Sequence, residues 1–132
     1  MKTHVLDASA LMTFFEDRHG ADQVEDLLAS AAETKHSLLM SVVNWGEVYY
    51  SIWRMRGETF ANEKLAQIGQ LPIEIMEVDM EMGKLAAILK AKHHLPYADC
   101  FAAALSQARR AMLVTSDKDF GRVGDLLKIL WV

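Results

Sequence analysis

The sequence has a single cysteine, Cys100, and only two prolines, Pro72 and Pro96, among its 132 residues. One cysteine cannot form a disulfide within the chain or a zinc site of four thiolates, and it suits a reducing compartment. The prolines lie far apart, and no Gly/Ser-rich linker marks a domain boundary. A chain of this length is expected to form one domain, residues 1–132, around one core.

The sequence also lacks long apolar runs and an excess of basic residues. No stretch reaches the roughly 18 apolar residues that a membrane helix needs, and Asp7 leaves no room for the apolar segment of a secretion signal. Fourteen Lys and Arg against 18 Asp and Glu give a net charge of −4, which is not the balance of a protein that binds nucleic acid by charge alone. We therefore expect a soluble, cytoplasmic protein with no membrane contact.

What the sequence does have is an alternation of short apolar runs and helical patterns. Hydrophobic residues make up 52% and charged residues 24%, which excludes a disordered chain. Strands are predicted at 3–6, 37–40, 73–78, 112–115 and 128–132, and helices at 9–15, 21–32, 42–56, 58–68, 80–92 and 97–111. Gly20 is expected to stop the first helix. This order predicts an α/β fold, a three-layer sandwich whose central, mainly parallel sheet of about four to five short strands is flanked by helices.

Acidic residues follow several of the predicted strands. Asp7 comes after the first strand, and Asp117 and Asp119 come after the strand at 112–115. Asp99 opens the alanine-rich helix that leads into that strand, and Glu47 lies in the second turn of the helix after the second strand. Ligands of open α/β sheets bind outside the carboxyl ends of the strands, so the fold can bring these acids together. Taken singly, each Asp can equally serve as a helix cap.

Glu47 is the acid that a capping role does not explain. It stands in a largely apolar helical stretch, Asn44–Tyr50. A carboxylate in such surroundings is costly unless it is paired or bound to a metal. Arg54 is the helical neighbour that could pair with it, and a salt bridge to Arg54 is the purely structural alternative.

Four segments together resemble the motifs of PIN-domain nucleases. Residues 5–11 (VLDASAL) resemble the first motif and residues 44–48 (NWGEV) the second, a helical Glu after small or polar residues. Residues 95–104 (LPYADCFAAA) are similar to the third, and residues 113–120 (LVTSDKDF) to the fourth. One such motif occurs by chance, but four in the right order over nearly the whole chain are a specific signal.

The resemblance implies a metal-dependent endoribonuclease, most similar to the VapC toxins of bacterial toxin–antitoxin pairs. It implies one or two Mg²⁺ or Mn²⁺ ions as cofactor. Carried over motif by motif, the catalytic and metal-binding residues are Asp7, Glu47, Asp99 and Asp117, with Asp119 as a further acid not ranked against Asp117. Ser9 and Thr115 match supporting hydroxyl positions, or they cap the adjoining turns.

The resemblance also implies partners: an RNA substrate, a small VapB-like antitoxin and a second copy of the chain in a homodimer. The apolar stripe of Trp45, Tyr49, Ile52 and Met55 then either packs in the core or forms part of the antitoxin groove. Arg54 and Arg56 are candidate RNA contacts, and residues 90–94 and 109–110 form two more basic stretches. Basic residues in a last helical turn also offset the helix dipole, which is the alternative for each stretch.

Other functions remain open on the sequence alone. A haloacid-dehalogenase-like phosphatase also has an Asp after its first strand, but it needs a second Asp where this chain has Ser9. A receiver domain needs an acidic pair and a late Lys, and it has no use for Glu47. Within the PIN class, the alternatives are an RNA-processing nuclease without an antitoxin and a non-catalytic binding module.

Overall fold

The structure, a computed structural model, describes residues 2–132. Its elements are β1 (Lys2–Leu6), α1 (Ala8–Phe15), α2 (Ala21–Ala32), β2 (His36–Ser41), α3 (Val42–Arg56), α4 (Glu58–Ile68), β3 (Glu74–Met76), α5 (Met80–His93), α6 (Tyr97–Arg109), β4 (Met112–Thr115), the 3₁₀ segment η1 (Lys118–Leu126) and β5 (Ile129–Trp131). Within residues 2–132, no helix combines the length and the apolar character needed to cross a membrane.

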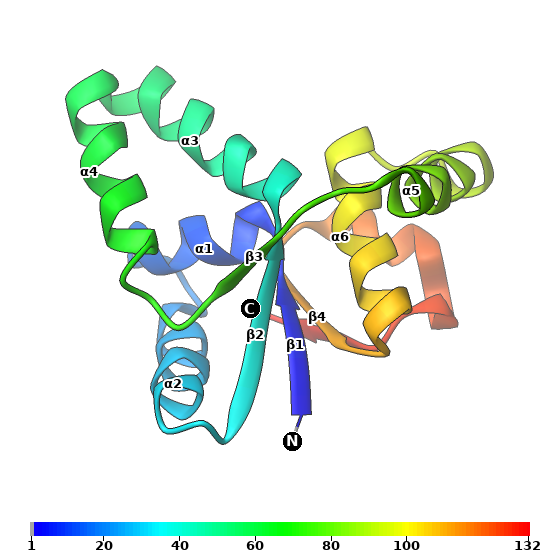
Figure 1. The fold of residues 1–132 in the computed structure, drawn as a ribbon, viewed down its shortest axis with the longest axis horizontal. Helices are drawn as coiled ribbons and strands as arrows, with labels where there is room; N and C mark the ends of the chain where they lie inside the picture. The colour runs from blue at the N-terminus through cyan, green and yellow to red at the C-terminus, as the bar shows by residue number, and fades with distance from the viewer. Residues whose placement is uncertain (1) are drawn as a thin grey trace.

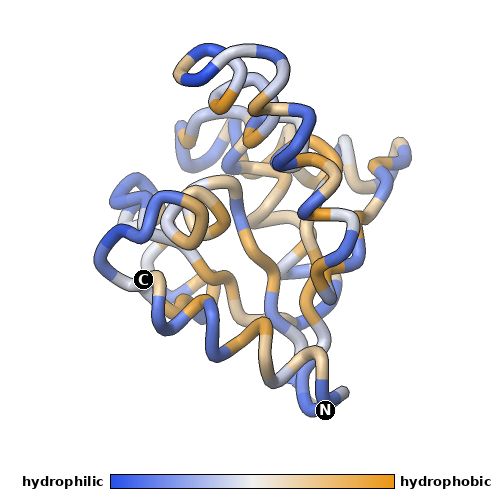
Figure 2. The backbone as a smooth tube through the Cα atoms, turned by 90° about the vertical axis from the view of Figure 1, so that its left-hand side faces the viewer, coloured by the Kyte–Doolittle hydropathy of each residue, from blue (hydrophilic) through white to orange (hydrophobic). Residues whose placement is uncertain are grey.

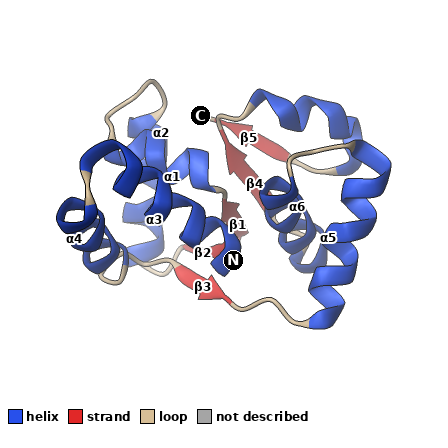
Figure 3. Ribbon diagram, turned by 90° about the horizontal axis from the view of Figure 1, so that it is seen from above, coloured by secondary structure: helices blue, strands red, loops and turns tan. Residues whose placement is uncertain are grey.

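The five strands form one parallel sheet in the order β3-β2-β1-β4-β5. Helices α1 to α4 cover one face, and α5 and α6 cover the other (Figure 1). Seen from above, the sheet runs between these two groups of helices (Figure 3). The predicted α/β sandwich is confirmed.

Alternation along the strands divides the core between the two faces of the sheet. Val5 and Leu113 belong to the apolar cluster packed against α5 and α6, while Leu6 and Val114 belong to the cluster packed against α1 and α3. All four are fully buried, because successive strand residues point to opposite faces and both faces are covered. The backbone trace shows the same distribution, with apolar segments inside and hydrophilic ones outside (Figure 2).

Polar side chains begin three of the helices directly after extended backbone. Asp7, Ser41 and Asp79 cap α1, α3 and α5 by accepting hydrogen bonds from backbone N–H groups. Such caps satisfy donors that the first helical turn leaves free. The predicted caps Ser41 and Asp79 are confirmed, and Asp7 has a capping role as well.

Two predictions about where elements end were wrong, and one element was not predicted. Gly20 does not stop α1, which ends at Phe15; Gly20 instead precedes α2 with a φ of 96°. The third strand is shorter than the predicted 73–78, since only Glu74–Met76 pairs with β2. The sequence reading also assigned no element to η1, which connects β4 to β5.

The order of the strands determines where a site can form. The chain passes from β1 outward to β2 and β3, then crosses to β4 on the other side of β1. The connections after β1 and β4 therefore leave on opposite faces, and they open a crevice at the carboxyl ends of these two strands. Asp7 follows β1 at this point, and Asp117 follows β4.

Candidate metal centre

Asp7 is held at the end of β1 by a set of short hydrogen bonds. Its Oδ1 accepts from the Ser9 hydroxyl at 2.7 Å and from the Ala10 N–H at 2.9 Å, and its Oδ2 accepts from the Thr115 hydroxyl at 2.5 Å. Burial raises the pKa of Asp7 to about 6, although these three hydrogen bonds oppose the rise. The negative charge of Asp117 adds to it.

Ser9 and Thr115 also fix the loop after β4. The Ser9 Oγ accepts from the Ser116 N–H at 2.9 Å, and the Thr115 Oγ1 accepts from the Asp117 N–H at 2.9 Å. The Ser9 Oγ and the Thr115 Oγ1 lie 3.1 Å apart. Each hydroxyl therefore contacts the other hydroxyl, the Asp7 carboxylate and the backbone of the loop at residues 116–117. The structure thus places the two predicted supporting residues between the two segments that they join.

Asp99, Asp117 and Asp119 form the tightest group of acids. One carboxylate oxygen from each lies within 4.8 Å of the others. Asp99 comes from the first turn of α6, while Asp117 and Asp119 come from the start of η1, where Asp117 accepts from the Asp119 N–H at 2.9 Å. Both acids therefore lie near Asp99, but Asp117 alone of the two contributes to the raised pKa values of Asp7, Glu47 and Asp99, whereas Asp119 pairs with Arg122 at 3.5 Å.

Asp99 is the most perturbed acid of the group. It is 5% exposed, and its Oδ2 is buried with no hydrogen-bond partner. Burial, followed by the hydrogen bond with Asp117 and the negative charges of Asp117, Asp7 and Glu47, raises the pKa of Asp99 to about 8. Asp7 and Glu47 thus act on Asp99 through their negative charges, although they lie outside the 4.8 Å group.

Glu47 faces the site without the partner that the structural alternative required. Arg54 lies over the ring of Tyr50, 5.2 Å from its centroid, and it makes no ion pair with Glu47. The Glu47 Oε1 instead accepts from the amide of Asn44 at 3.1 Å. Burial raises the pKa of Glu47, the hydrogen bond from Asn44 opposes this, and the charge of Asp117 adds to the rise. The Arg54 pairing is therefore wrong.

Asn44 is a site residue that the sequence reading missed. It is fully buried, and its Nδ2 donates both to Glu47 and to the backbone carbonyl of Ala98, each at 3.1 Å. The only signal in the sequence is an amide three residues before Glu47 in an apolar helix. Asn44 thus links α3 to the start of α6, next to Asp99.

The donor set fits a hard divalent cation. Clustered carboxylates repel one another and shift their pKa values upward, and a bound cation removes this penalty by serving as their counter-ion. Mg²⁺ and Mn²⁺ prefer oxygen ligands and keep several waters, so three nearby carboxylates suffice. The unpartnered oxygen of Asp99 is the kind of buried atom that such an ion satisfies.

Arg54 and Arg56 stand apart from this centre, at the far end of α3 from Glu47. Arg56 lies over the ring of Phe60, 5.3 Å from its centroid, and both arginines belong to the last helical turn. Of the predicted apolar stripe, Ile52 is buried but Met55 is 53% exposed. Trp45 and Tyr49 are half-buried against the same core cluster, so the stripe borders the core and reaches the surface at Met55.

Comparisons with known proteins agree with this fold. No curated protein sequence matches the chain. Among solved structures, VapBC2 of Rickettsia felis bound to a promoter DNA fragment superposes with a TM-score of 0.79 at 17% identity, over 98% of each chain. The Mycobacterium tuberculosis toxin VapC20, which cleaves the sarcin–ricin loop, gives 0.73 at 17% identity, covering 92% of this chain and 95% of its own. A toxin–antitoxin complex from Klebsiella pneumoniae gives 0.70 at 19% identity, covering 96% and 95%. At this identity the likeness shows the fold.

The PIN domain family model matches residues 4–126, and the chain therefore belongs to the PIN domain family.

Proposed function

We propose that this PIN domain is the toxin of a toxin–antitoxin pair and an endoribonuclease that hydrolyses RNA with Mg²⁺ or Mn²⁺. The observation that carries the proposal is the meeting of Asp99, Asp117 and Asp119 within 4.8 Å beside the buried Asp7 and the half-buried Glu47. Structural neighbours that are VapBC toxins and complexes support the toxin role.

The arrangement suits phosphodiester hydrolysis. A divalent ion supplies a bound water of lowered pKa and polarises the phosphate. The chain's own part is to hold that ion with Asp99, Asp117 and either Asp119 or Asp7, in a setting that the hydroxyls of Ser9 and Thr115 keep rigid. Glu47, fixed by Asn44, is placed to accept a proton or to orient water at the edge of the group.

A cleavage assay tests the proposal directly. Asp99→Asn, which keeps the shape of the side chain but removes its charge, should lower the rate of RNA cleavage in Mn²⁺ by about 100-fold or more. Glu63→Gln on the exposed face of α4 is the matched control and should keep the full rate. Cleavage by the Asp99→Asn protein at the rate of the unchanged chain would indicate a contaminating nuclease and remove the proposal. RNA binding without cleavage by either protein would favour the non-catalytic module.

A groove on the α1 side provides a place for the antitoxin that we propose. A hollow of about 340 Å³ lies between α1, α3 and α4 and is lined by Met12, Phe15, Glu16, Asp17, Ile52, Met55, Arg56, Phe60 and Lys64. Its lining combines five apolar side chains with four charged ones, which suits an amphipathic segment of a partner. In the same assay, the product of the adjacent reading frame should suppress cleavage, and Met55→Glu should relieve this suppression. Full suppression of Met55→Glu would place the antitoxin elsewhere.

The homodimer stays a prediction. On α5, Met80 is 92% exposed and Ile88 is 40% exposed, and they give the molecule an apolar surface away from the groove. Sedimentation of the chain alone decides the point, because a monomer at micromolar concentration would exclude a stable dimer.

A further inference from the structure

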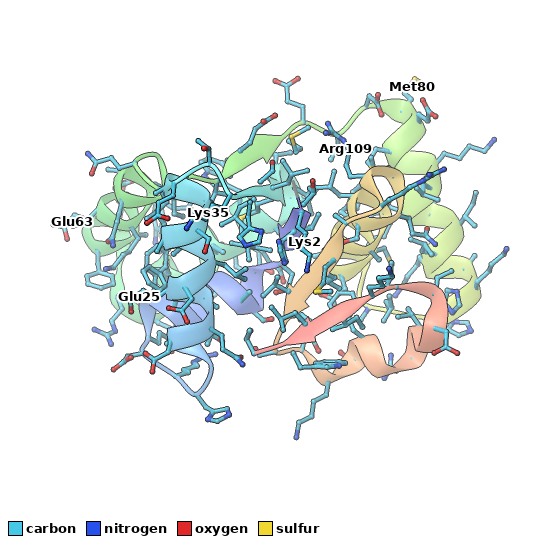
Figure 4. All side chains as sticks on the ribbon, turned by 90° about the horizontal axis from the view of Figure 1, so that it is seen from below. Lys2, Glu25, Lys35, Glu63, Met80 and Arg109 are labelled. Atoms are coloured by element: carbon cyan, nitrogen blue, oxygen red, sulfur yellow. The ribbon has the colours of Figure 1, made fainter. Side chains whose placement is uncertain are left out.

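Basic residues gather at the opposite end of the sheet from the acids. Lys2, Arg109, Arg110 and Lys128 line an open pocket of about 370 Å³, together with Thr3, His4 and Met112. We call this the basal pocket. Seen from below, the labelled Lys2 and Arg109 lie on this side of the molecule (Figure 4). No carboxylate lines it.

The four cations of the basal pocket have no acidic partner. The ion pairs within residues 2–132 join Arg18 to Glu16, Lys35 to Glu33 and Arg122 to Asp119, and none of them involves the pocket. The helix dipole accounts for Arg109, which lies in the last turn of α6. It does not account for Lys2 and Lys128, which stand at the start of β1 and just before β5.

The floor of the basal pocket is polar as well. His4 lines it and is 5% exposed, and its Nδ1 is buried with no hydrogen-bond partner. Its ring packs edge-to-face on that of His36, with the centroids 5.2 Å apart. A buried imidazole nitrogen without a partner, in a pocket lined by four unpaired cations, is a setting that an anion would stabilise.

The basal pocket continues toward the segment that carries Asp117 and Asp119. Arg110 and Lys128 also line an adjoining hollow that includes Leu126 and Leu127, at the end of η1. η1 begins at Lys118, beside the acids, and so it connects the carboxyl end of β4 to the amino end of β5. The five residues of β1 separate the two ends of the sheet by roughly 16 Å at about 3.3 Å per residue.

We propose that the basal pocket binds phosphates of the RNA backbone, at a distance from the bond that is cut. This inference rests on the proposed function. Lys and Arg side chains hold nucleic acid mainly through phosphates, without reading sequence. Because the acids at the other end repel phosphate wherever no metal lies between, the basal pocket supplies attraction that the catalytic end lacks. A short RNA stem laid along η1 covers this separation of roughly 16 Å.

The test measures binding of a labelled 20-nucleotide RNA hairpin in the Asp99→Asn background, which keeps the RNA intact. Arg109→Gln with Arg110→Gln should weaken binding roughly tenfold and reduce the slope of log K against log salt by about 2. The matched control, Lys64→Gln on α4 with Lys84→Gln on α5, removes the same charge outside the pocket and should change binding less than about twofold. Equal weakening by both pairs would overturn the proposal, as would no effect of the arginine pair.

A second variant and a second substrate keep the result independent of folding and of the proposed function. Lys128→Gln lies in the loop before β5 and should reduce the slope by about 1 without changing the melting temperature. In the otherwise unchanged chain, the arginine pair should raise KM for the hairpin but leave cleavage of a trinucleotide unaffected, because two adjacent phosphates cannot reach both ends. Failure of the unchanged chain to cut RNA refutes the proposed function, whereas unaltered hairpin binding by the arginine and lysine variants refutes only the basal pocket.

Discussion

Asn44 joins two parts of the site through one amide group. Its Nδ2 serves both Glu47 on α3 and the Ala98 carbonyl at the start of α6, and the residue is fully buried. Removing the amide leaves the half-buried Glu47 carboxylate and the Ala98 carbonyl without this donor. Such unsatisfied groups cost about 1–3 kcal/mol.

We therefore expect Asn44→Ala to lower the free energy of unfolding by about 1–3 kcal/mol in urea titrations. Asn62→Ala is a control of the same residue type, because Asn62 accepts a single exposed hydrogen bond from the Tyr49 hydroxyl at 2.8 Å. Its cost should stay below about 0.5 kcal/mol. Equal costs for the two variants would mean that Asn44 does not act through the buried site.

The same residues show how far the sequence alone reaches at this scale. Asp7 and Asp117 could be placed because each follows an apolar strand, and the ends of parallel strands meet. The prediction that Glu47 pairs with Arg54 was wrong because helical spacing alone allows that pair, whereas in the fold Glu47 faces Asn44 and Asp117. Asn44 was missed because its second acceptor, Ala98, is 54 residues away.

Among the elements, the start of α2 depends on one glycine. Gly20 has a φ of 96°, and a Cβ placed on it would lie 2.4 Å from the carbonyl carbon of Val132. A side chain there would overlap the backbone of Val132, and it would also force an L-residue into the left-handed conformation that such residues avoid. Gly20→Ala should therefore lower the free energy of unfolding by at least about 2 kcal/mol.

Gly83 in α5 provides the opposite case and serves as the control. A Cβ at Gly83 meets nothing within 4 Å, so Gly83→Ala should raise the free energy of unfolding by about 0.5–1 kcal/mol through helix propensity. Denaturant titration of both variants checks the pair. A mild effect of Gly20→Ala, similar in size to that of Gly83→Ala, would contradict the close packing of the chain end on the α2 turn.

Elements with strong periodicity were predictable, and the weakly periodic one was not. Residues 21–32, 42–56 and 58–68 were predicted as helices with the bounds that the structure has. η1 was not predicted, since a 3₁₀ segment has neither a 3.6-residue nor a 2-residue repeat and Gly124, with a φ of 55°, interrupts it. η1 lies at the edge of the site because it connects β4 directly to the parallel neighbouring strand β5. That pairing is known only from the order of the strands in the sheet.

At the scale of the whole molecule, charge is divided between the two ends of the sheet. Acids collect at the carboxyl ends of β1 and β4 and unpaired cations at the amino ends, although the net charge is only −4. Composition could not reveal this, because it averages over the surface. The acidic end should make folding of the metal-free protein depend on pH.

The direction in which stability changes with pH follows from the raised pKa values of Asp7 and Asp99. Asp7 and Asp99 ionise near 3.8 when unfolded, but at about 6 and about 8 when folded. The unfolded chain therefore loses these protons first, and the stability that they contribute below pH 4 disappears progressively up to about pH 8. The lowered pKa of His4 acts in the opposite direction, since folding then weakens as the pH falls below 6.5. The difference between the unchanged chain and Asp99→Asn isolates the contribution of Asp99.

We expect Asp99→Asn to melt higher than the unchanged chain in EDTA, with a margin that widens from pH 5 to pH 8, because the amide carries no charge to bury. Mn²⁺ should reverse this order at pH 8 by binding the ionised carboxylates; at about 100 times its Kd it adds about 2.7 kcal/mol. At pH 5 protons compete for the same oxygens, so the effect of Mn²⁺ should be smaller. Melting curves at both pH values, with and without Mn²⁺, measure all three effects. A margin that is constant between pH 5 and pH 8 would show that Asp99 ionises normally, and an equal response of both proteins to Mn²⁺ would show that Asp99 does not hold the ion.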